Sequence, residues 1–283
     1  MSKSCRYLLS GGDDTALIVW DLETTKMHEK IVPQRESMIY SLVIAKDETR
    51  CVACLWNGDV HVFSFPTDIQ PLAVLNGHTN VVMSVDADDR FLRAVSASWD
   101  TTARVWNLQD YTCERVLSKH TSDCNAVAIS RDGTKCVTGS DDDECYLWCL
   151  QTGEVMRVFR GHAKMVVSVA LKSYGDVFMV AAASWDGVCR VYDSTVSKLN
   201  CNSGMISAVH HGKIACVQFS PSGSYLATGS FDRTSQFVDL FKEDRNRMIL
   251  LLKYRRMPTE IAMNIRMMLF LVMMMRDATL FVV

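Results

Sequence analysis

The sequence has little proline, little glycine and no long hydrophobic run. It holds 5 prolines and 14 glycines among 283 residues, so no proline-rich or glycine-rich linker divides the chain. The longest uninterrupted apolar stretch, residues 267–275, is about half of what a membrane-spanning helix needs. The first five residues contain no signal-peptide core. We therefore expect a globular protein of the cytoplasm, or of the nucleus, that does not insert into a membrane.

Excess charge of one sign is also missing. The 30 basic and 32 acidic residues give a net charge of −2, which argues against direct binding of nucleic acid by a basic surface. The 11 cysteines are an odd number scattered through apolar stretches, whereas a secreted disulfide framework would favour an even number in a shorter chain. Free, mostly buried thiols are the expectation.

Motifs of common enzyme classes are absent. The chain has no Gly-x-Ser-x-Gly elbow, no phosphate-binding loop and no His-Glu-x-x-His. We therefore expect no catalytic residues, no metal site and no cofactor.

The chain instead contains a repeat that runs through its whole length. An aromatic or apolar anchor recurs at positions 20, 63, 106, 148, 192, 238 and 283, at intervals of 42 to 46 residues. Six residues before each anchor stands an aspartate, or an asparagine at position 57. Seven matches in register predict a repeat architecture, which is a stronger signal than any single motif here.

Each repeat reads as short strands separated by turns. In the third repeat, the runs 81–85, 91–95, 103–106 and 113–117 are rich in β-branched and aromatic residues. Four strands per period predict one small antiparallel sheet per repeat. Such a sheet cannot bury both of its faces alone, so successive sheets must stack on one another.

A period near 43 residues with Gly-His at its start and Trp-Asp at its end resembles the WD-repeat β-propeller family. The residues that carry this resemblance are Gly77-His78, Gly161-His162, Trp20-Asp21, Tyr192-Asp193 and the loop 219–223. The resemblance implies an all-β fold, a seven-bladed β-propeller of four-stranded antiparallel blades. It extends over essentially the whole chain, residues 1–283, as a single propeller.

The register of the repeat gives approximate blade boundaries and leaves two blades incomplete. The predicted blades are 1–35, 36–77, 78–119, 120–161, 162–204, 205–256 and 257–283. The chain enters blade 1 at its second strand and stops at the anchor of blade 7. Twenty-six strands are therefore expected instead of twenty-eight, with the first and last blades one strand short.

A histidine, a serine and an aspartate recur at similar spacing in successive repeats. The sets are His78, Ser98 and Asp100; His120, Ser140 and Asp142; His162, Ser184 and Asp186; and His210, Ser230 and Asp232. Catalytic sets are normally unique, so the recurrence indicates a structural role. In the family that the chain resembles, these residues form a hydrogen-bonded tetrad with the aromatic anchor, here Trp106, Trp148 and Tyr192. The serine would join the second ring nitrogen of the histidine to the indole N–H.

The residue before each turn aspartate is the best candidate for binding. In the family this position lies on the top face near the central channel, and here it is Asp13, Trp56, Trp99, Asp141, Trp185, Phe231 and Arg276. Large aromatics are enriched in binding hot spots. Packing against neighbouring blades is the alternative explanation for these rings. The first residues of each inner strand, such as Met83, Asn125 and Lys213, are expected on the same face.

The leading interpretation is a non-catalytic scaffold that binds partner proteins or peptides on the top face, as part of a multiprotein complex. An RNA-associated propeller subunit that stacks bases on the same rings is the alternative, and a propeller enzyme is a further one. A heterotrimeric G-protein β-subunit is similar in its Ser-Trp-Asp turns. Such a subunit begins with a helical coiled coil, however, whereas this chain is expected to start almost directly with a strand.

Overall fold

Every regular element in the described part of the protein is a β-strand. The structure, a computed structural model, describes residues 4, 6–32, 37–174, 177–193, 205–240 and 248–253. Within these ranges the strands β1 to β23 form six antiparallel sheets, and none of the described residues belongs to a helix that could span a bilayer. The predicted all-β class is confirmed.

Each sheet is a meander in which every strand pairs with the next one along the chain. The first sheet has three strands, β1 (Tyr7–Gly11), β2 (Leu17–Asp21) and β3 (Lys26–Ile31). The second and third sheets contain β4 (Ile39–Ile44), β5 (Arg50–Leu55), β6 (Val60–Ser64) and β7 (Pro71–Leu75), then β8 (Val82–Ala87), β9 (Arg93–Ser98), β10 (Ala103–Asn107) and β11 (Thr112–Leu117). The fourth contains β12 (Cys124–Ile129), β13 (Lys135–Ser140), β14 (Cys145–Cys149) and β15 (Val155–Phe159). The fifth and sixth contain β16 (Val166–Tyr174), β17 (Val177–Ser184), β18 (Val188–Asp193) and β19 (Met205–Val209), then β20 (Ile214–Phe219), β21 (Tyr225–Ser230), β22 (Thr234–Asp239) and β23 (Met248–Lys253).

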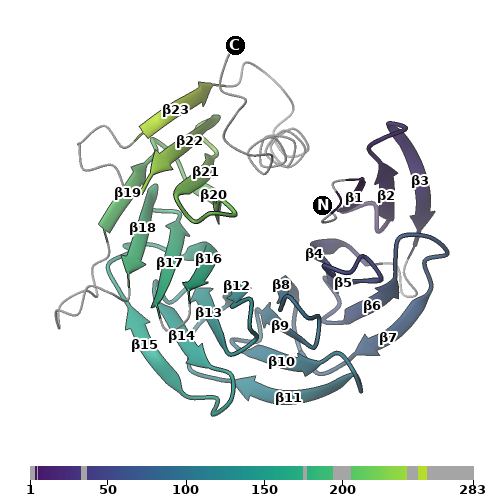
Figure 1. Cartoon of the computed structure of the whole chain (residues 1–283). Coiled ribbons are helices and arrows are strands. Elements are labelled where there is room, and N and C mark those ends of the chain that lie inside the picture. Colours follow the sequence, from purple (N-terminus) through teal and green to yellow (C-terminus); the bar gives the residue numbers. More distant parts are fainter. Residues whose placement is uncertain are drawn as a thin grey trace.

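The six sheets surround a common centre like the blades of a propeller (Figure 1). The first strand of each four-stranded blade lies nearest the centre, and neighbouring inner strands such as β8 and β12 are in contact. Within the described residues the first sheet has three strands, the number predicted for the first blade. The seventh predicted blade, residues 257–283, lies outside the described residues, so the count of seven stays a prediction.

The hydrophobic core is divided into layers between successive blades. One such layer joins Val52 and Val62 of the second sheet to Val85, Ala94 and Trp106 of the third. Four further layers of the same kind lie between the other neighbouring sheets. The middle strands are therefore buried on both faces, which explains why their sequences are continuously apolar or small rather than alternating.

The cysteines contribute to these layers as small apolar residues. The nine cysteines in the described ranges are free, and six of them are buried. Burial raises the pKa of the Cys51 and Cys54 thiols to about 12, so both stay protonated and unreactive at neutral pH.

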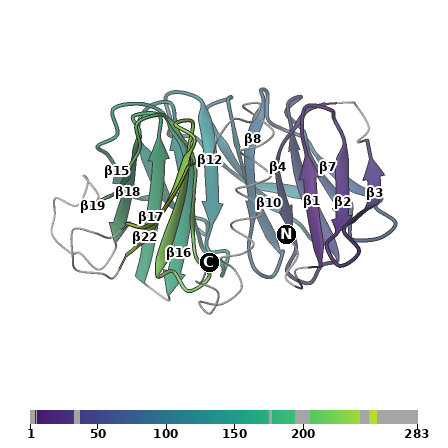
Figure 2. The same ribbon diagram turned by 90° about the horizontal axis from the view of Figure 1, so that it is seen from above.

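The strands run between two faces on which the loops collect (Figure 2). We define the top face as the one formed by the turns that link the second and third strands of each blade. In six blades this turn places the residue after the aspartate or asparagine at positive φ: Thr15, Gly58, Thr101, Asp143, Gly187 and Arg233. At Gly187 an added Cβ would lie 2.8 Å from the carbonyl oxygen of His210, so this turn requires glycine for space as well as for backbone conformation.

Candidate functional site

One backbone hydrogen bond, repeated in five blades, sets the top face. The residue before the turn aspartate or asparagine donates its N–H to the carbonyl of the residue immediately before the inner strand. The pairs are Trp56 to Met38, Trp99 to Val81, Asp141 to Asp123, Trp185 to Met165 and Phe231 to Lys213, at 2.9 to 3.1 Å. The repeat therefore brings these five predicted residues to the same end of their blades. Asp13 occupies the corresponding turn of the first blade, and Arg276 lies outside the described residues.

Three aromatic rings of the top face touch in series. Tyr40 stacks on Trp56 with ring centroids 5.8 Å apart, and Trp56 meets Trp99 edge to face, also at 5.8 Å. Trp56 is 45% exposed and Tyr40 is 38% exposed, which is unusual for rings of this size. We call Tyr40, Trp56 and Trp99 the aromatic strip.

Tyr40 was missing from the residues expected at this face. It stands 43 positions before Met83, so it occupies the same place in its repeat as Met83 and Asn125. The period could therefore have identified it. Its strand-start neighbour Met38 is 38% exposed and extends the apolar surface beside the strip.

The strip continues into polar side chains on the fourth blade. The indole N–H of Trp99 donates to Oδ1 of Asn125 at 3.1 Å, and the amide of Asn125 donates to Oδ1 of Asp141 at 2.5 Å. On the other side, burial and the nearby Asp13 carboxylate raise the pKa of the Tyr40 phenol. Carboxylates therefore flank the aromatic strip at both ends.

The remaining two predicted aromatics have different surroundings. Nζ of Lys213 lies 3.5 Å from the ring centroid of Trp185, a cation–π contact that covers one face of this ring. Phe231 is 52% exposed and is not among the residues with a ring contact in the described part of the chain. The seven predicted positions therefore do not form one uniform surface.

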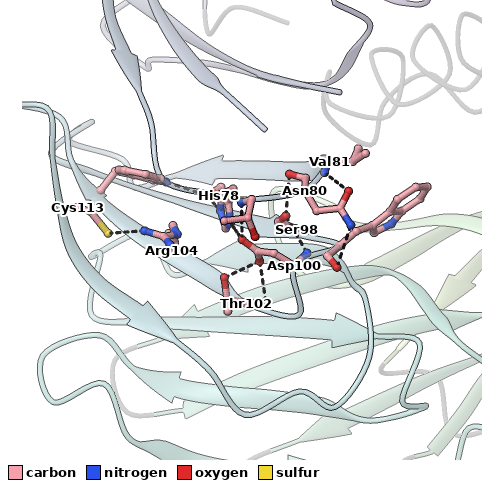
Figure 3. A network of polar contacts seen from close by, with 12 residues as sticks. His78, Asn80, Val81, Ser98, Asp100, Thr102, Arg104 and Cys113 are labelled. Atoms are coloured by element: carbon pink, nitrogen blue, oxygen red, sulfur yellow. Dashed lines mark hydrogen bonds and ion pairs between the residues drawn. The ribbon is translucent and has the colours of Figure 1, made fainter. Parts of the chain in front are cut away.

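The histidine network is present, but with a different serine from the one predicted. In the third blade, Nδ1 of His78 lies 2.7 Å from Oδ2 of Asp100 (Figure 3). The hydroxyl of Ser96, not of Ser98, lies 2.7 Å from Nε2 of His78 and accepts the indole N–H of Trp106 at 2.8 Å. Because a carboxylate only accepts, Nδ1 of His78 carries the proton and Ser96 donates to Nε2.

Ser98 has a separate task in the turn. Its hydroxyl donates to the carbonyl of Asn80 at 3.1 Å and accepts the backbone N–H of Asp100 at 3.1 Å (Figure 3). Ser96 and Ser98 point to the same side of β9, but Ser98 is nearer the turn, which is why its hydroxyl engages the turn backbone. Ser140, Ser184 and Ser230 make the same turn contacts, so the prediction that they complete the tetrads was wrong.

The true bridging position stands ten residues before the anchor. In the fourth blade Thr138 contacts His120 Nε2 at 2.8 Å and the Trp148 indole at 2.9 Å, while His120 Nδ1 lies 2.8 Å from Asp142. In the sixth blade Thr228 contacts His210, which also lies 3.2 Å from Asp232. In the first blade Ser10 accepts the Trp20 indole N–H.

The fifth blade lacks this bridge. Ala182 stands where the first, third, fourth and sixth blades have serine or threonine, and Tyr192 stands where the first, third and fourth blades have tryptophan. His162 Nδ1 lies 3.0 Å from Asp186, but its buried Nε2 has no hydrogen-bond partner among the described residues. The Tyr192 hydroxyl donates to the carbonyl of Arg160 instead.

The ionisable aspartates and histidines of the network are hydrogen-bonded to one another inside each of the third to sixth blades. Burial alone would raise the pKa of the Asp100 carboxyl, but hydrogen bonds from His78 and Thr102 outweigh it and lower this pKa. Burial lowers the pKa of His162 and of His210, which keeps both rings neutral. Nucleophilic chemistry would need an available hydroxyl beside a base, and every hydroxyl of the third-blade network is already committed. Across the described residues, no three His, Cys, Asp or Glu side chains gather in a metal-binding arrangement.

Known proteins share this repeat. Residues 69–107, 111–149, 153–193 and 204–239 match the family described as WD domain, G-beta repeat. The chain is 35% identical over 164 residues to a guanine nucleotide-binding protein subunit beta of Solanum tuberosum, a match that covers 56% of this chain and 43% of that protein. It is 26% identical over 255 residues to the autophagy-related protein 16 of Arabidopsis thaliana, covering 89% and 48% of the two chains. The chain thus spans about half the length of the curated relatives it matches.

Proposed function

This chain belongs to the WD-repeat family, and from that premise we propose that it is a non-catalytic scaffold that binds a partner protein on its top face. The observation that carries the proposal is the aromatic strip. Two of its three rings are more than a third exposed, although packing between blades buries other large rings such as Trp106 almost completely. Exposed aromatic clusters of this kind are typical of binding hot spots.

The surroundings of the strip indicate the chemistry of the partner. Asp13 lies near Tyr40, and Asp141 is joined to Trp99 through Asn125. A basic side chain set among apolar ones would gain cation–π contacts from the rings and ion-pair contacts from the carboxylates. The same carboxylates would repel a phosphate backbone, so the face suits a protein better than RNA.

The relatives are consistent with this proposal at a coarser level. The printed name of one relative denotes a subunit of a larger assembly, and neither name denotes a catalytic activity. We infer that this chain also works within a multiprotein complex.

The test is affinity capture with the wild-type protein and with Trp56→Ala, compared by quantitative mass spectrometry and followed by Kd measurements with each purified captured protein. Loss of a hot-spot aromatic typically costs about 2 kcal/mol or more, equivalent to about thirty-fold in Kd. The matched control is Leu72→Ala on outer strand β7, where the side chain is 43% exposed. Circular dichroism checks that both variants are folded. Partners that bind Trp56→Ala as tightly as the wild type would refute the proposal.

A further inference from the structure

The exposed charged side chains beside the top-face turns differ in sign between two groups of blades. Around the aromatic strip and the neighbouring fourth-blade turn stand five carboxylates, Asp13, Asp14, Asp123, Asp141 and Asp143. None of the five forms an ion pair within the described ranges. Burial and Asp141 raise the pKa of the Asp123 carboxyl, as expected where acidic groups repel one another.

The half formed by the fifth and sixth blades carries cations instead. Lys164 precedes β16, Lys213 precedes β20, and Arg233 lies in the turn after β21, and all three are exposed. In the part of the chain that the structure describes, none of these three is paired with a carboxylate. Phe231, which donates its N–H to the carbonyl of Lys213, adds an exposed apolar surface beside them.

Lys213 also changes what the aromatic ring of this half can bind. Its ammonium covers a face of the Trp185 ring, at 3.5 Å from the centroid, where a cation from a partner would otherwise sit. An ammonium over a ring still has N–H donors that point away from the ring. Lys213 therefore blocks the face of Trp185 on which a cation of the partner could bind, while its own ammonium can still donate a hydrogen bond to an anion.

We infer that the partner segment crosses the top face with a basic side chain on the aromatic strip and an acidic side chain at Lys213. Lys213 therefore determines the preference for the acidic side chain. This inference rests on the proposed function, because it describes the partner of the same face. It requires one segment that reaches from the second and third blades to the fifth and sixth, with its two charges in a fixed order.

The experiment uses an immobilised library of synthetic peptides in an apolar background. Each peptide carries one arginine and one glutamate, in both orders and at varied spacing, and sister peptides carry two arginines, two glutamates or no charge. The full chain is applied as wild type, Lys213→Glu, Lys213→Gln, Trp56→Ala and Lys30→Glu. Lys30 is exposed on β3, the outer strand of the first sheet, so its variant matches the charge change of Lys213→Glu away from the fifth and sixth blades.

We expect the wild type to retain arginine–glutamate peptides of one order in preference to all others. Lys213→Glu should lose affinity for these peptides by about tenfold or more and should now prefer the two-arginine peptides. Lys213→Gln should lose the preference for glutamate without gaining one for arginine, and Lys30→Glu should bind like the wild type.

The outcomes separate this inference from the proposed function. If Trp56→Ala loses the peptides but Lys213→Glu selects the same peptides as the wild type, the role of Lys213 is refuted and the proposed function stands. If Trp56→Ala retains the peptides as well as the wild type does, the strip is not their site and the proposed function fails with the inference. Retention of no arginine–glutamate peptide above the uncharged background overturns the inference. Thermal unfolding curves confirm that each variant is folded.

Discussion

Replacement of Ser96 by alanine tests the corrected hydrogen-bond network most sharply. The substitution removes one hydroxyl that serves both Nε2 of His78 and the indole N–H of Trp106, and all three side chains are almost fully buried. Each orphaned polar group costs about 1–3 kcal/mol, so we expect Ser96→Ala to lower the free energy of unfolding by about 2–4 kcal/mol. The loss should be larger than that of an ordinary surface substitution.

The measurement is urea-induced unfolding followed by tryptophan fluorescence and by circular dichroism. The rescue variant is Ser96→Thr, because Thr138 and Thr228 fill the same position in the fourth and sixth blades. We expect Ser96→Thr to recover most of the lost stability. A Ser96→Ala protein whose free energy of unfolding stays within about 0.5 kcal/mol of the wild type would refute the reasoning, since that is the range of neutral surface changes.

Three further predictions concern the fourth and fifth blades. Ala182→Ser should stabilise the protein by about 1 kcal/mol in urea unfolding, because it offers the unpartnered Nε2 of His162 a donor, and a loss of stability would contradict this. Burial lowers the pKa of His162 in the folded protein below its unfolded value of 6.5. The contribution of this histidine to stability is therefore present above pH 6.5 and is lost as the pH falls through the folded-state pKa. An NMR titration of His162 with a midpoint above pH 6.5 would contradict this. Gly139→Ala should lower the free energy of unfolding by about 1–3 kcal/mol, because its Cβ would lie 2.6 Å from Cγ1 of Val166 in the core layer between the fourth and fifth blades. An unchanged melting curve would contradict this expectation.

The fold was predictable because the same repeat occurs several times along the chain. The anchors at 106, 148 and 192 and the turn aspartates six residues before them fix the strand order of each blade independently. A single segment can match the repeat pattern by chance, but several matches in the same register along the chain are very unlikely to arise by chance. The same redundancy predicted that the first sheet of the described residues has three strands, because the register of the repeat enters that blade at its second strand.

The details of the site were less predictable, for physical reasons that differ from residue to residue. Ser96 and Ser98 share one side of β9, so alternation alone cannot decide which hydroxyl reaches His78. The distinguishing signal was the hydroxyl residue ten positions before the anchor, present as Ser10, Thr138 and Thr228. Composition could not show that Lys213 covers Trp185, because that contact joins side chains of two different blades.

The aromatic strip depends on contacts between blades in the same way. Trp56 and Trp99 belong to successive repeats, and only the stacking of the blades brings their rings to 5.8 Å. The sequence could mark each ring as a candidate, but the choice between binding and packing required their exposure. Trp56 is 45% exposed, which favours binding, whereas the more covered Trp185 has a cation from its own chain on its face.

The central claim is that the aromatic strip holds the partner of this scaffold. The most direct measurement is the equilibrium Kd of a purified captured partner for the wild type, for Trp56→Ala and for the exposed control Leu72→Ala. We predict that Trp56→Ala raises the Kd by about thirty-fold or more, while Leu72→Ala leaves it unchanged. An unchanged Kd for Trp56→Ala, in a protein with the wild-type unfolding curve, would contradict the account.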